Sequence, residues 1–213
     1  GTNQRNEAVL GYVCWVMVRK RDLEAPAPEV CVPDLTKAVA VSDLVIPAGL
    51  NFANYDFELA GERYRAGDYT VGEVIEHVDG VTVEEAEHML ATRLWQNTAK
   101  VHFDATFRPD GQRLIYGGHI ISLARALSFN GLANAQMMVA INGGAHANPC
   151  YSGMTVKAWS EVLDVAETSA PGVAAIRLRL VATSGTGSEL RGADGKYHPE
   201  VLLDLDYWAL MPA

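Results

Sequence analysis

Nine consecutive residues, 96–104, hold side chains suited to proton transfer. The stretch reads Gln-Asn-Thr-Ala-Lys-Val-His-Phe-Asp, so Asn97 stands five residues before His102 and Asp104 two residues after it. An imidazole exchanges protons near neutral pH, which would allow His102 to act as a general acid or base. A lone histidine more often has a structural role in a loop, so this hypothesis depends on what surrounds it.

Two adjacent glycines, Gly117 and Gly118, precede an apolar stretch that predicts a helix. The first backbone N–H groups of a helix have no intrahelical acceptor and lie at the positive end of the helix dipole. They could therefore stabilise a negatively charged oxygen. The alternative is that the glycines serve close packing or a turn, and both roles can hold together.

A strand and a helix are expected before the 96–104 stretch. Residues 71–78 have the apolar pattern of a strand, and Gly80 is expected to turn the chain towards the helix. Thr82 and Glu85 have the spacing of a capping box. The stripe expected to be buried consists of Val83, Ala86, Leu90 and Leu94. The helix should end near Gln96.

The helix after Gly118 is apolar around nearly its whole circumference, which predicts a helix enclosed by other structure. Four strand-like segments follow it, near residues 137–142, 154–163, 173–183 and 201–210. Strands that can wrap around one apolar helix predict an α+β protein with the hot-dog architecture, an antiparallel sheet around a long central helix.

The composition excludes several classes of protein. Hydrophobic residues make up 49 % of the chain and charged residues 20 %, and no apolar stretch approaches the roughly 18 residues of a membrane span. A net charge of −9 argues against a nucleic-acid partner. Cys14, Cys31 and Cys150 are too few and too far apart for a disulfide framework or a zinc site, so we expect a cytoplasmic protein. No further ligand cluster accompanies His102 and His119 at a metal-binding spacing.

Residues 7–18 and 200–211 share an apolar, aromatic-rich strand pattern in which a Glu, a Leu and a Trp align. A repeated domain would explain this match, whereas chance similarity in composition is the alternative. We therefore expect residues 1–21 to hold the last strand of an N-terminal hot-dog domain. Residues 22–50, which are rich in proline, would form a linker, and residues 51–213 a second hot-dog domain.

The order of motifs from residue 71 onward resembles the MaoC-like dehydratase family, with matches at residues 72–77, 82–88, 101–104, 115–122 and 149–156. Residues 96–103, 123–132 and 203–208 more narrowly resemble the bacterial mesaconyl-CoA hydratases, also called β-methylmalyl-CoA dehydratases. These are tandem hot-dog proteins whose C-terminal copy is expected to be catalytic. The resemblance implies pairing with a second hot-dog copy, and a homo-oligomer is also possible.

The resemblance implies a hydro-lyase that adds water to an enoyl-CoA, converting mesaconyl-CoA to β-methylmalyl-CoA, with coenzyme A only as part of the substrate. His102 matches the family's catalytic histidine, but Asn97 stands where the family has a carboxylate, and an amide cannot act as a base. Either Asn97 orients the water while His102 transfers protons, or a nearby group replaces the carboxylate. The candidate replacements are Asp104, His119 and Glu87.

The resemblance also aligns Ser122 with a helix serine that hydrogen-bonds near the catalytic loop. Four cations lie on or beside the motifs and could bind the anionic substrate: Arg125, Arg113, Lys100 and Arg93. Among these four cations, Arg125 is the first candidate for binding the substrate, because it interrupts an apolar helix. For each of the four, the alternative is a solvated surface charge. His77 and His88 are expected at exposed or capped positions without a special role.

Other functions remain open on the sequence alone. The chain could hydrate a different enoyl-CoA, or it could be a non-catalytic acyl-CoA-binding domain, since Asn97 lacks the family's acid. A hot-dog thioesterase would use a carboxylate on the central helix, and residues 117–133 contain neither Asp nor Glu.

Overall fold

The computed structural model describes residues 1–16, 18, 20–187 and 189–213. The chain divides into two compact units, Gly1–Leu35 and Thr36–Ala213. Each unit is described separately.

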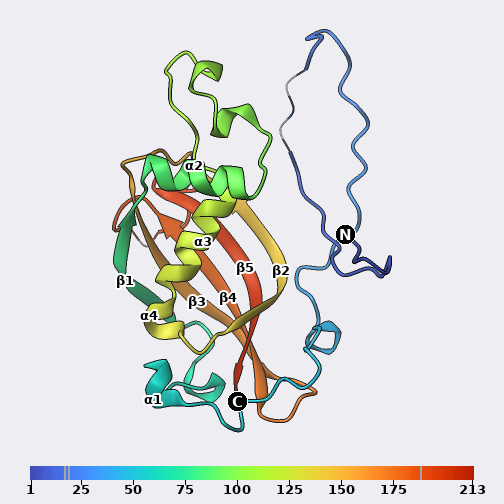
Figure 1. The fold of residues 1–213 in the computed structure, drawn as a ribbon, viewed down its shortest axis with the longest axis vertical. Helices are drawn as coiled ribbons and strands as arrows, with labels where there is room; N and C mark the ends of the chain where they lie inside the picture. The colour runs from blue at the N-terminus through green and yellow to red at the C-terminus, as the bar shows by residue number, and fades with distance from the viewer. Residues whose placement is uncertain (17, 19, 188) are drawn as a thin grey trace. The chain divides into compact units, whose positions relative to one another are not determined.

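The second unit is built on one antiparallel sheet, in the strand order β1-β3-β4-β5-β2 (Figure 1). Its strands are β1 (Val74–Thr82), β2 (Met137–His146), β3 (Thr155–Glu167), β4 (Val173–Thr183) and β5 (Val201–Pro212). The four strands expected after the central helix are therefore confirmed, and each of them except β4 extends two to four residues beyond the predicted limits at its C-terminal end. β4 and β5 are buried along nearly their whole length.

Helix α3 (Gly117–Leu127) lies along one face of this sheet, and the short helix α4 (Phe129–Leu132) follows it (Figure 1). Ile120, Ala124 and Leu127 of α3 join the main hydrophobic core with strand residues such as Leu178 and Leu205. This arrangement confirms the predicted α+β hot-dog fold. The helix is enclosed on the sheet side only, since Ser122 and Ala126 are exposed.

The other face of the sheet carries a second, smaller core. Leu44 packs there with Trp208 and Leu210, and the 3-10 helix η1 (Val41–Asp43) precedes it in the chain. The backbone of Val39 donates to Oδ1 of Asn142 at 2.9 Å, and its carbonyl accepts from Nε1 of Trp208 at 3.1 Å. Residues 36–50, expected as part of a linker, thus pack on the sheet.

Helix α2 (Glu85–Leu94) begins without the predicted capping box. Thr82 belongs to β1, and its Oγ1 lies 2.8 Å from Oγ1 of Thr155 instead of capping the helix. Gly80 also lies inside β1, where the register with β3 shifts between His77 and Gly80. The strand therefore starts later than predicted and continues through the residues expected to form a turn. Pairing with β3 gives these residues backbone hydrogen bonds that they would lack in a turn.

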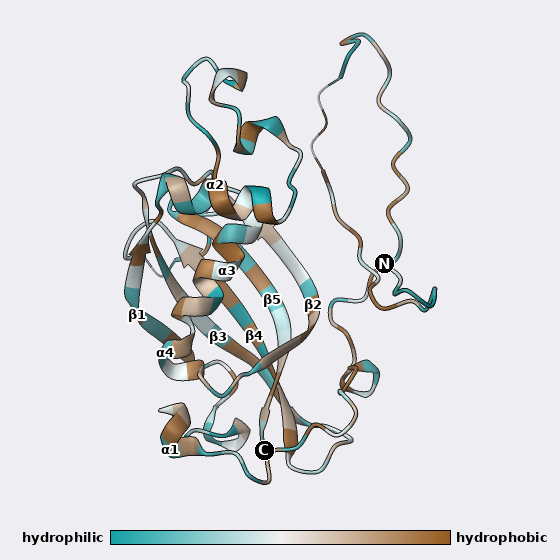
Figure 2. Cartoon of the chain, in the orientation of Figure 1, coloured by the Kyte–Doolittle hydropathy of each residue, from teal (hydrophilic) through white to brown (hydrophobic). Residues whose placement is uncertain are grey.

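The predicted buried face of α2 is also wrong. Leu90 and Leu94 are 53 % and 68 % exposed, whereas the buried residues of the helix are His88, Ala91 and Thr92. Hydrophobic and hydrophilic segments alternate along α2 in Figure 2. Its inward face is partly polar: Nε2 of His88 accepts from the backbone of Tyr116 and Thr92 donates to the carbonyl of His88, which apolar periodicity does not detect.

Two short elements, α1 (Phe57–Ala60) and the 3-10 helix η2 (Ala66–Asp68), precede β1. Asp56 caps α1 by accepting from the backbone of Leu59 at 2.8 Å. Tyr69 follows η2 and donates from its hydroxyl to the carbonyl of Gly131 at 2.8 Å. That bond ties this segment to α4, at the end of the domain far from α2 (Figure 1).

The first unit contains no strand among its described residues. Within residues 7–18, where a strand was expected, Ala8 forms an isolated bridge with Thr2, and Tyr12 and Trp15 are exposed. Met17 lies outside the described residues, as does Arg19. A strand needs a partner for its backbone hydrogen bonds, and within the described residues 9–16 only Val9 and Leu10 form such bonds, both with Gly1. Whether this segment belongs to a repeated domain stays a prediction.

No helix among the described residues is both long and apolar enough to cross a membrane.

Candidate active site

His102 lies in the loop that joins α2 to α3, at the end of the 3-10 helix η3 (Lys100–His102). Its Nδ1 lies 2.8 Å from the carbonyl oxygen of Leu114, and the backbone of Leu114 donates to Val101 at 3.0 Å. A carbonyl oxygen only accepts hydrogen bonds, so the ring of a neutral His102 carries its proton on Nδ1. The lone pair is then on Nε2, which can act as a base.

Asn97 is half-buried at the start of the same loop, just after α2. Gln96 has a φ of 52°, the left-handed conformation that commonly ends a helix, and it turns the chain there. Oδ1 of Asn97 accepts from the backbone N–H of Ala99 at 2.9 Å. Among the described residues its Nδ2 group has no partner, so this group could donate to a water molecule.

Asp104 is engaged in the structure of the loop. It caps the 3-10 helix η4 (Ala105–Phe107), where its Oδ1 accepts from the hydroxyl of Thr106 at 2.6 Å and from the backbone N–H of the same residue at 2.9 Å. These bonds lower the pKa of Asp104, and the bond from the hydroxyl of Thr106 has the largest effect. A carboxylate held in this way is a poor base, which argues against Asp104 as the replacement for the family's acid.

Glu87 and His119 contact each other across the α2–α3 boundary. Oε1 of Glu87 lies 3.6 Å from Nε2 of His119, and the His119 side chain is almost completely buried. The two groups could exchange a proton with each other. The pair joins α2 to the first turn of α3, whereas His102 lies in the loop between these two helices.

Gly117 and Gly118 form the start of α3, where there is no space for side chains. A Cβ at position 117 would collide with the ring of His146, and a Cβ at position 118 would lie 2.7 Å from the ring of Tyr116. Both contacts are closer than real Cβ atoms tolerate, so two aromatic rings occupy the space that side chains here would need. Tyr116 also packs edge-on against His102, with ring centroids 5.8 Å apart.

Two histidines that the sequence did not single out lie at this site. His146 comes from the end of β2, and the surrounding protein, followed by the nearby charge of His102, lowers its pKa. His88 comes from α2 and is fully buried, as is His77 elsewhere in the domain, so the expectation that His77 and His88 are exposed or capped is wrong. His77 bonds to the carbonyl of Asn130 and to Ser160, both at 2.8 Å.

Ser122 bonds within its own helix instead of to the loop that carries His102. Its Oγ donates to the carbonyl of Gly118, one turn earlier in the same helix, at 3.0 Å. No group of three or more His, Cys, Asp and Glu side chains in the described part of the chain is arranged to hold a metal ion.

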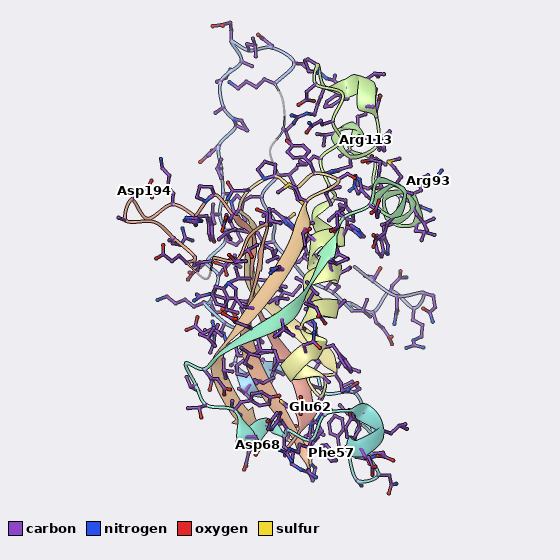
Figure 3. All side chains as sticks on the ribbon, turned by 90° about the vertical axis from the view of Figure 1, so that its left-hand side faces the viewer. Phe57, Glu62, Asp68, Arg93, Arg113 and Asp194 are labelled. Atoms are coloured by element: carbon purple, nitrogen blue, oxygen red, sulfur yellow. The ribbon has the colours of Figure 1, made fainter. Side chains whose placement is uncertain are left out.

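Three of the predicted cations lie at the α2 end of the domain. Arg113 forms an ion pair with Glu85, Arg93 is exposed in the last turn of α2, and Lys100 is exposed in η3. Figure 3 shows Arg93 and Arg113 at that end, with the acidic Glu62 and Asp68 at the opposite end. Glu85 neutralises Arg113, whereas the charges of Arg93 and Lys100 are exposed.

Arg125 lies apart from these groups. It is eight residues after Gly117, which corresponds to about 12 Å along the helix axis. Its guanidinium donates to Oγ of Ser128 at 2.6 Å and to the carbonyl of Ala135 at 2.9 Å, and it lies over the ring of Tyr207. These partners are neutral, so the anionic partner expected for a buried arginine is absent among the described residues. The structure does not bring Arg125 to His102.

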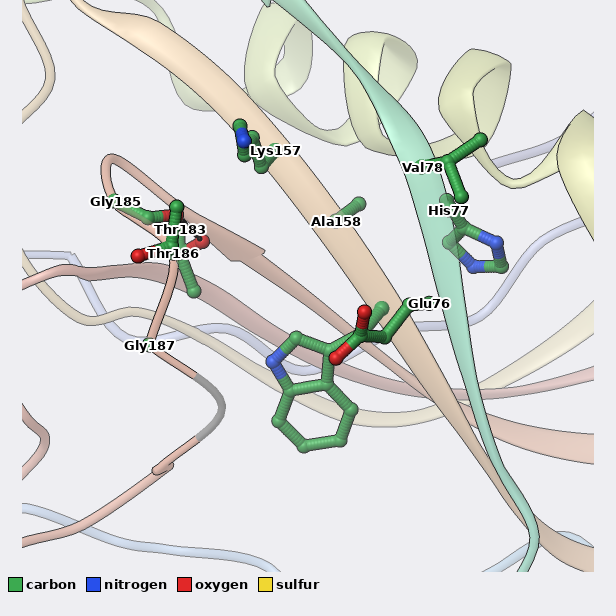
Figure 4. A pocket seen from close by; sticks show the side chains of 10 residues that line it. Glu76, His77, Val78, Lys157, Ala158, Thr183, Gly185, Thr186 and Gly187 are labelled. Atoms are coloured by element: carbon green, nitrogen blue, oxygen red, sulfur yellow. Dashed lines mark hydrogen bonds between the residues drawn. The ribbon is translucent and has the colours of Figure 1, made fainter.

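A small pocket of about 130 Å³ lies elsewhere, between β1, β3 and the chain after β4 (Figure 4). Glu76, Lys157 and Trp159 line it, together with residues 183 and 185–187. None of the residues predicted for catalysis or substrate binding lines this pocket. It is therefore distinct from the candidate active site.

Known proteins resemble this chain along its whole length. It is 73 % identical to a mesaconyl-CoA hydratase from Cereibacter sphaeroides and 55 % identical to a β-methylmalyl-CoA dehydratase from Chloroflexus aurantiacus. The whole chain aligns in both comparisons and spans 62 % of the length of each relative. No protein-family model matches the sequence.

Solved structures also resemble this chain. A crystal structure from Chloroflexus aurantiacus, described as a MaoC domain protein dehydratase, matches with a TM-score of 0.85 and 53 % identity over 92 % of this chain and 57 % of that one. The chain contains a hot-dog domain that is similar to MaoC-like dehydratases. A Mycobacterium tuberculosis protein with a double hot-dog fold matches this domain at a TM-score of 0.51 and 25 % identity, over 79 % of this chain and 48 % of that one.

Proposed function

We propose that this chain carries the catalytic hot-dog domain of a hydro-lyase that reversibly hydrates mesaconyl-CoA to β-methylmalyl-CoA. The single observation behind the proposal is the position of His102. Its Nδ1 is bound to Leu114, its Nε2 is basic, and its ring packs on Tyr116, the residue before the first turn of α3. The names of the relatives suggest the substrate.

In the proposed reaction, Nε2 of His102 takes a proton from water while the water oxygen bonds to the β carbon of the enoyl thioester. The π electrons of the double bond move towards the thioester, whose oxygen gains negative charge. The backbone N–H groups of Gly117 and Gly118 stabilise that charge. The imidazolium of His102 then returns the proton to the α carbon, which leaves one water added and His102 neutral again.

Asn97 supports this step as a hydrogen-bonding group. Its Oδ1 is held by Ala99, which leaves Nδ2 to orient the water. Asp104 and the Glu87–His119 pair are less suitable, because the first caps η4 and the two members of the second are paired with each other. One imidazole therefore performs both proton transfers.

We assign the anionic parts of the substrate, including those of coenzyme A, to Arg113, Lys100 and Arg93. The carboxylate of mesaconyl-CoA is only a few bonds from its thioester, which is too close for a group about 12 Å along the helix. Arg125 is for this reason removed from the substrate-binding set. Coenzyme A enters as part of the substrate, and the proposed step uses no other cofactor.

A second hot-dog copy is proposed as the partner of this domain. β1 and β2 are the edge strands of the described sheet, and Met137 and Ile141 of β2 are exposed. One side of α3 is exposed as well. A second copy, in the same polypeptide or in another subunit, would cover surfaces of this kind.

The test is the ultraviolet absorbance of the conjugated thioester when the full-length protein is mixed with mesaconyl-CoA. Loss of absorbance is expected for the hydratase. Crotonyl-CoA in a parallel reaction distinguishes a hydratase for another enoyl-CoA, which would react faster with it. Binding of mesaconyl-CoA without any change in absorbance would mean a non-catalytic acyl-CoA-binding domain and would overturn the proposal.

A further inference from the structure

We infer that His88 is a positioning residue that fixes the start of α3, and through it the N–H groups of Gly117 and Gly118. The inference rests on the function proposed above, in which these two groups receive the thioester oxygen. His88 is not part of the proposed proton transfer.

The bond that carries this inference joins two helices. The backbone N–H of Tyr116 donates to Nε2 of His88 at 2.9 Å, and the two residues are 28 positions apart. His88 lies on α2 and is completely buried, and Tyr116 is the residue immediately before α3. Since Nε2 accepts, the proton of the neutral ring is on Nδ1, which has no partner among the described residues.

The position of Tyr116 matters because its backbone sets the direction of the first turn of α3. It is the N-cap of α3, with φ −63° and ψ 129°, and its side chain makes no capping hydrogen bond. Many helices begin with a Ser, Thr, Asp or Asn whose side chain binds the first N–H groups. Here a ring from α2 holds the backbone one residue earlier, so the groups at Gly117 and Gly118 stay free for a ligand.

Through Tyr116, the same bond also affects the position of the proposed catalytic imidazole, that of His102. The ring of Tyr116 lies between those of His102, at 5.8 Å, and Trp95, at 6.3 Å, measured between centroids. A displacement of Tyr116 would thus move the packing surface of His102 together with the first turn of α3. His88 positions both the proposed base and the proposed oxyanion donors.

This role requires that His88 remain neutral. Burial lowers its pKa to about 4, and the neighbouring His119, His102 and Arg113 add to the effect. The ring of His119 is 6.2 Å away, and Arg113 is paired with Glu85. A protonated His88 would direct an N–H at the N–H of Tyr116, so the surroundings favour the form that can accept.

Two variants of the full-length protein test the inference. In His88→Gln the side-chain oxygen can accept from Tyr116, whereas His88→Leu has a similar volume and no acceptor. We expect His88→Leu to lower kcat by about 10- to 100-fold, somewhat less than the loss of an oxyanion donor, with KM within about two-fold. His88→Gln should restore most of kcat. Thr92→Val, a buried change on the same face of α2, is the matched control and should leave kcat unchanged.

A spectroscopic measurement separates this inference from the proposed function. Nitrogen-15 spectra of the histidines should show a neutral His88 with its proton on Nδ1, and the Tyr116 amide signal should shift in His88→Leu but little in His88→Gln. A wild-type protein without hydratase activity would refute the proposed function, while these spectra would still test the bond. A proton on Nε2 of His88, or a wild-type kcat in folded His88→Leu, would overturn the inference.

Discussion

Nδ1 of His102 lies 2.8 Å from the carbonyl oxygen of Leu114. This bond fixes the orientation of the ring and leaves the lone pair on Nε2. The chemistry proposed for this protein depends on that one bond more than on any other.

Asn97 is predicted to orient the attacking water. Replacing it with Ala removes both the Nδ2 donor and the bond from Ala99, so kcat for mesaconyl-CoA should fall by about 10-fold or more. Asn97→Asp retains the oxygen that holds Ala99 and should preserve the loop. Steady-state kinetics of the two variants give the comparison, and a near-normal kcat in Asn97→Ala would exclude this role.

Gly117 should not tolerate a methyl group, although alanine normally favours a helix. The ring of His146 occupies the space, so Gly117→Ala should lower the free energy of unfolding by about 1–3 kcal/mol. His146→Ala in the same chain should relieve most of this loss. Urea denaturation of the two single variants and the double variant measures the coupling; additive effects would show that the two residues do not compete for space.

Stability should depend on pH through His88. Its folded pKa of about 4 is below the 6.5 of a free imidazole, so the unfolded chain binds the proton first as the pH falls. The corresponding stabilisation is complete above pH 6.5 and is lost as the pH falls towards 4. Urea denaturation at pH 7 and pH 4.5 should show a smaller decrease for His88→Gln than for the wild type. Equal decreases would mean that His88 is not held neutral by the fold.

Arg125 is predicted to stabilise the domain without contacting the substrate. Arg125→Ala should lower the free energy of unfolding by about 1–3 kcal/mol, because Ser128 and Ala135 lose their bonds to the guanidinium. KM for mesaconyl-CoA and for crotonyl-CoA should change by the same factor. A selective increase of KM for mesaconyl-CoA would instead show that Arg125 binds the substrate carboxylate.

The strands and the central helix could be predicted because their apolar patterns match their burial. The face of α2 could not, since His88 and Thr92 are buried through hydrogen bonds to Tyr116 and to the helix backbone, which periodicity does not record. His146 has no local pattern that marks it, because only the fold brings the end of β2 to α3. Gly117 and Gly118 were a usable signal, as two glycines in one helical turn indicate that something else fills their space.

The most direct test compares the wild-type protein with His102→Ala in the mesaconyl-CoA absorbance assay. The wild type should remove the absorbance of the conjugated thioester, and the variant should do so at least about 100-fold more slowly, the lower range for loss of a general acid–base group. Its thermal unfolding should resemble that of the wild type, because His102 is half-buried and makes one hydrogen bond to the backbone. Turnover by folded His102→Ala at a near-normal rate would contradict the account.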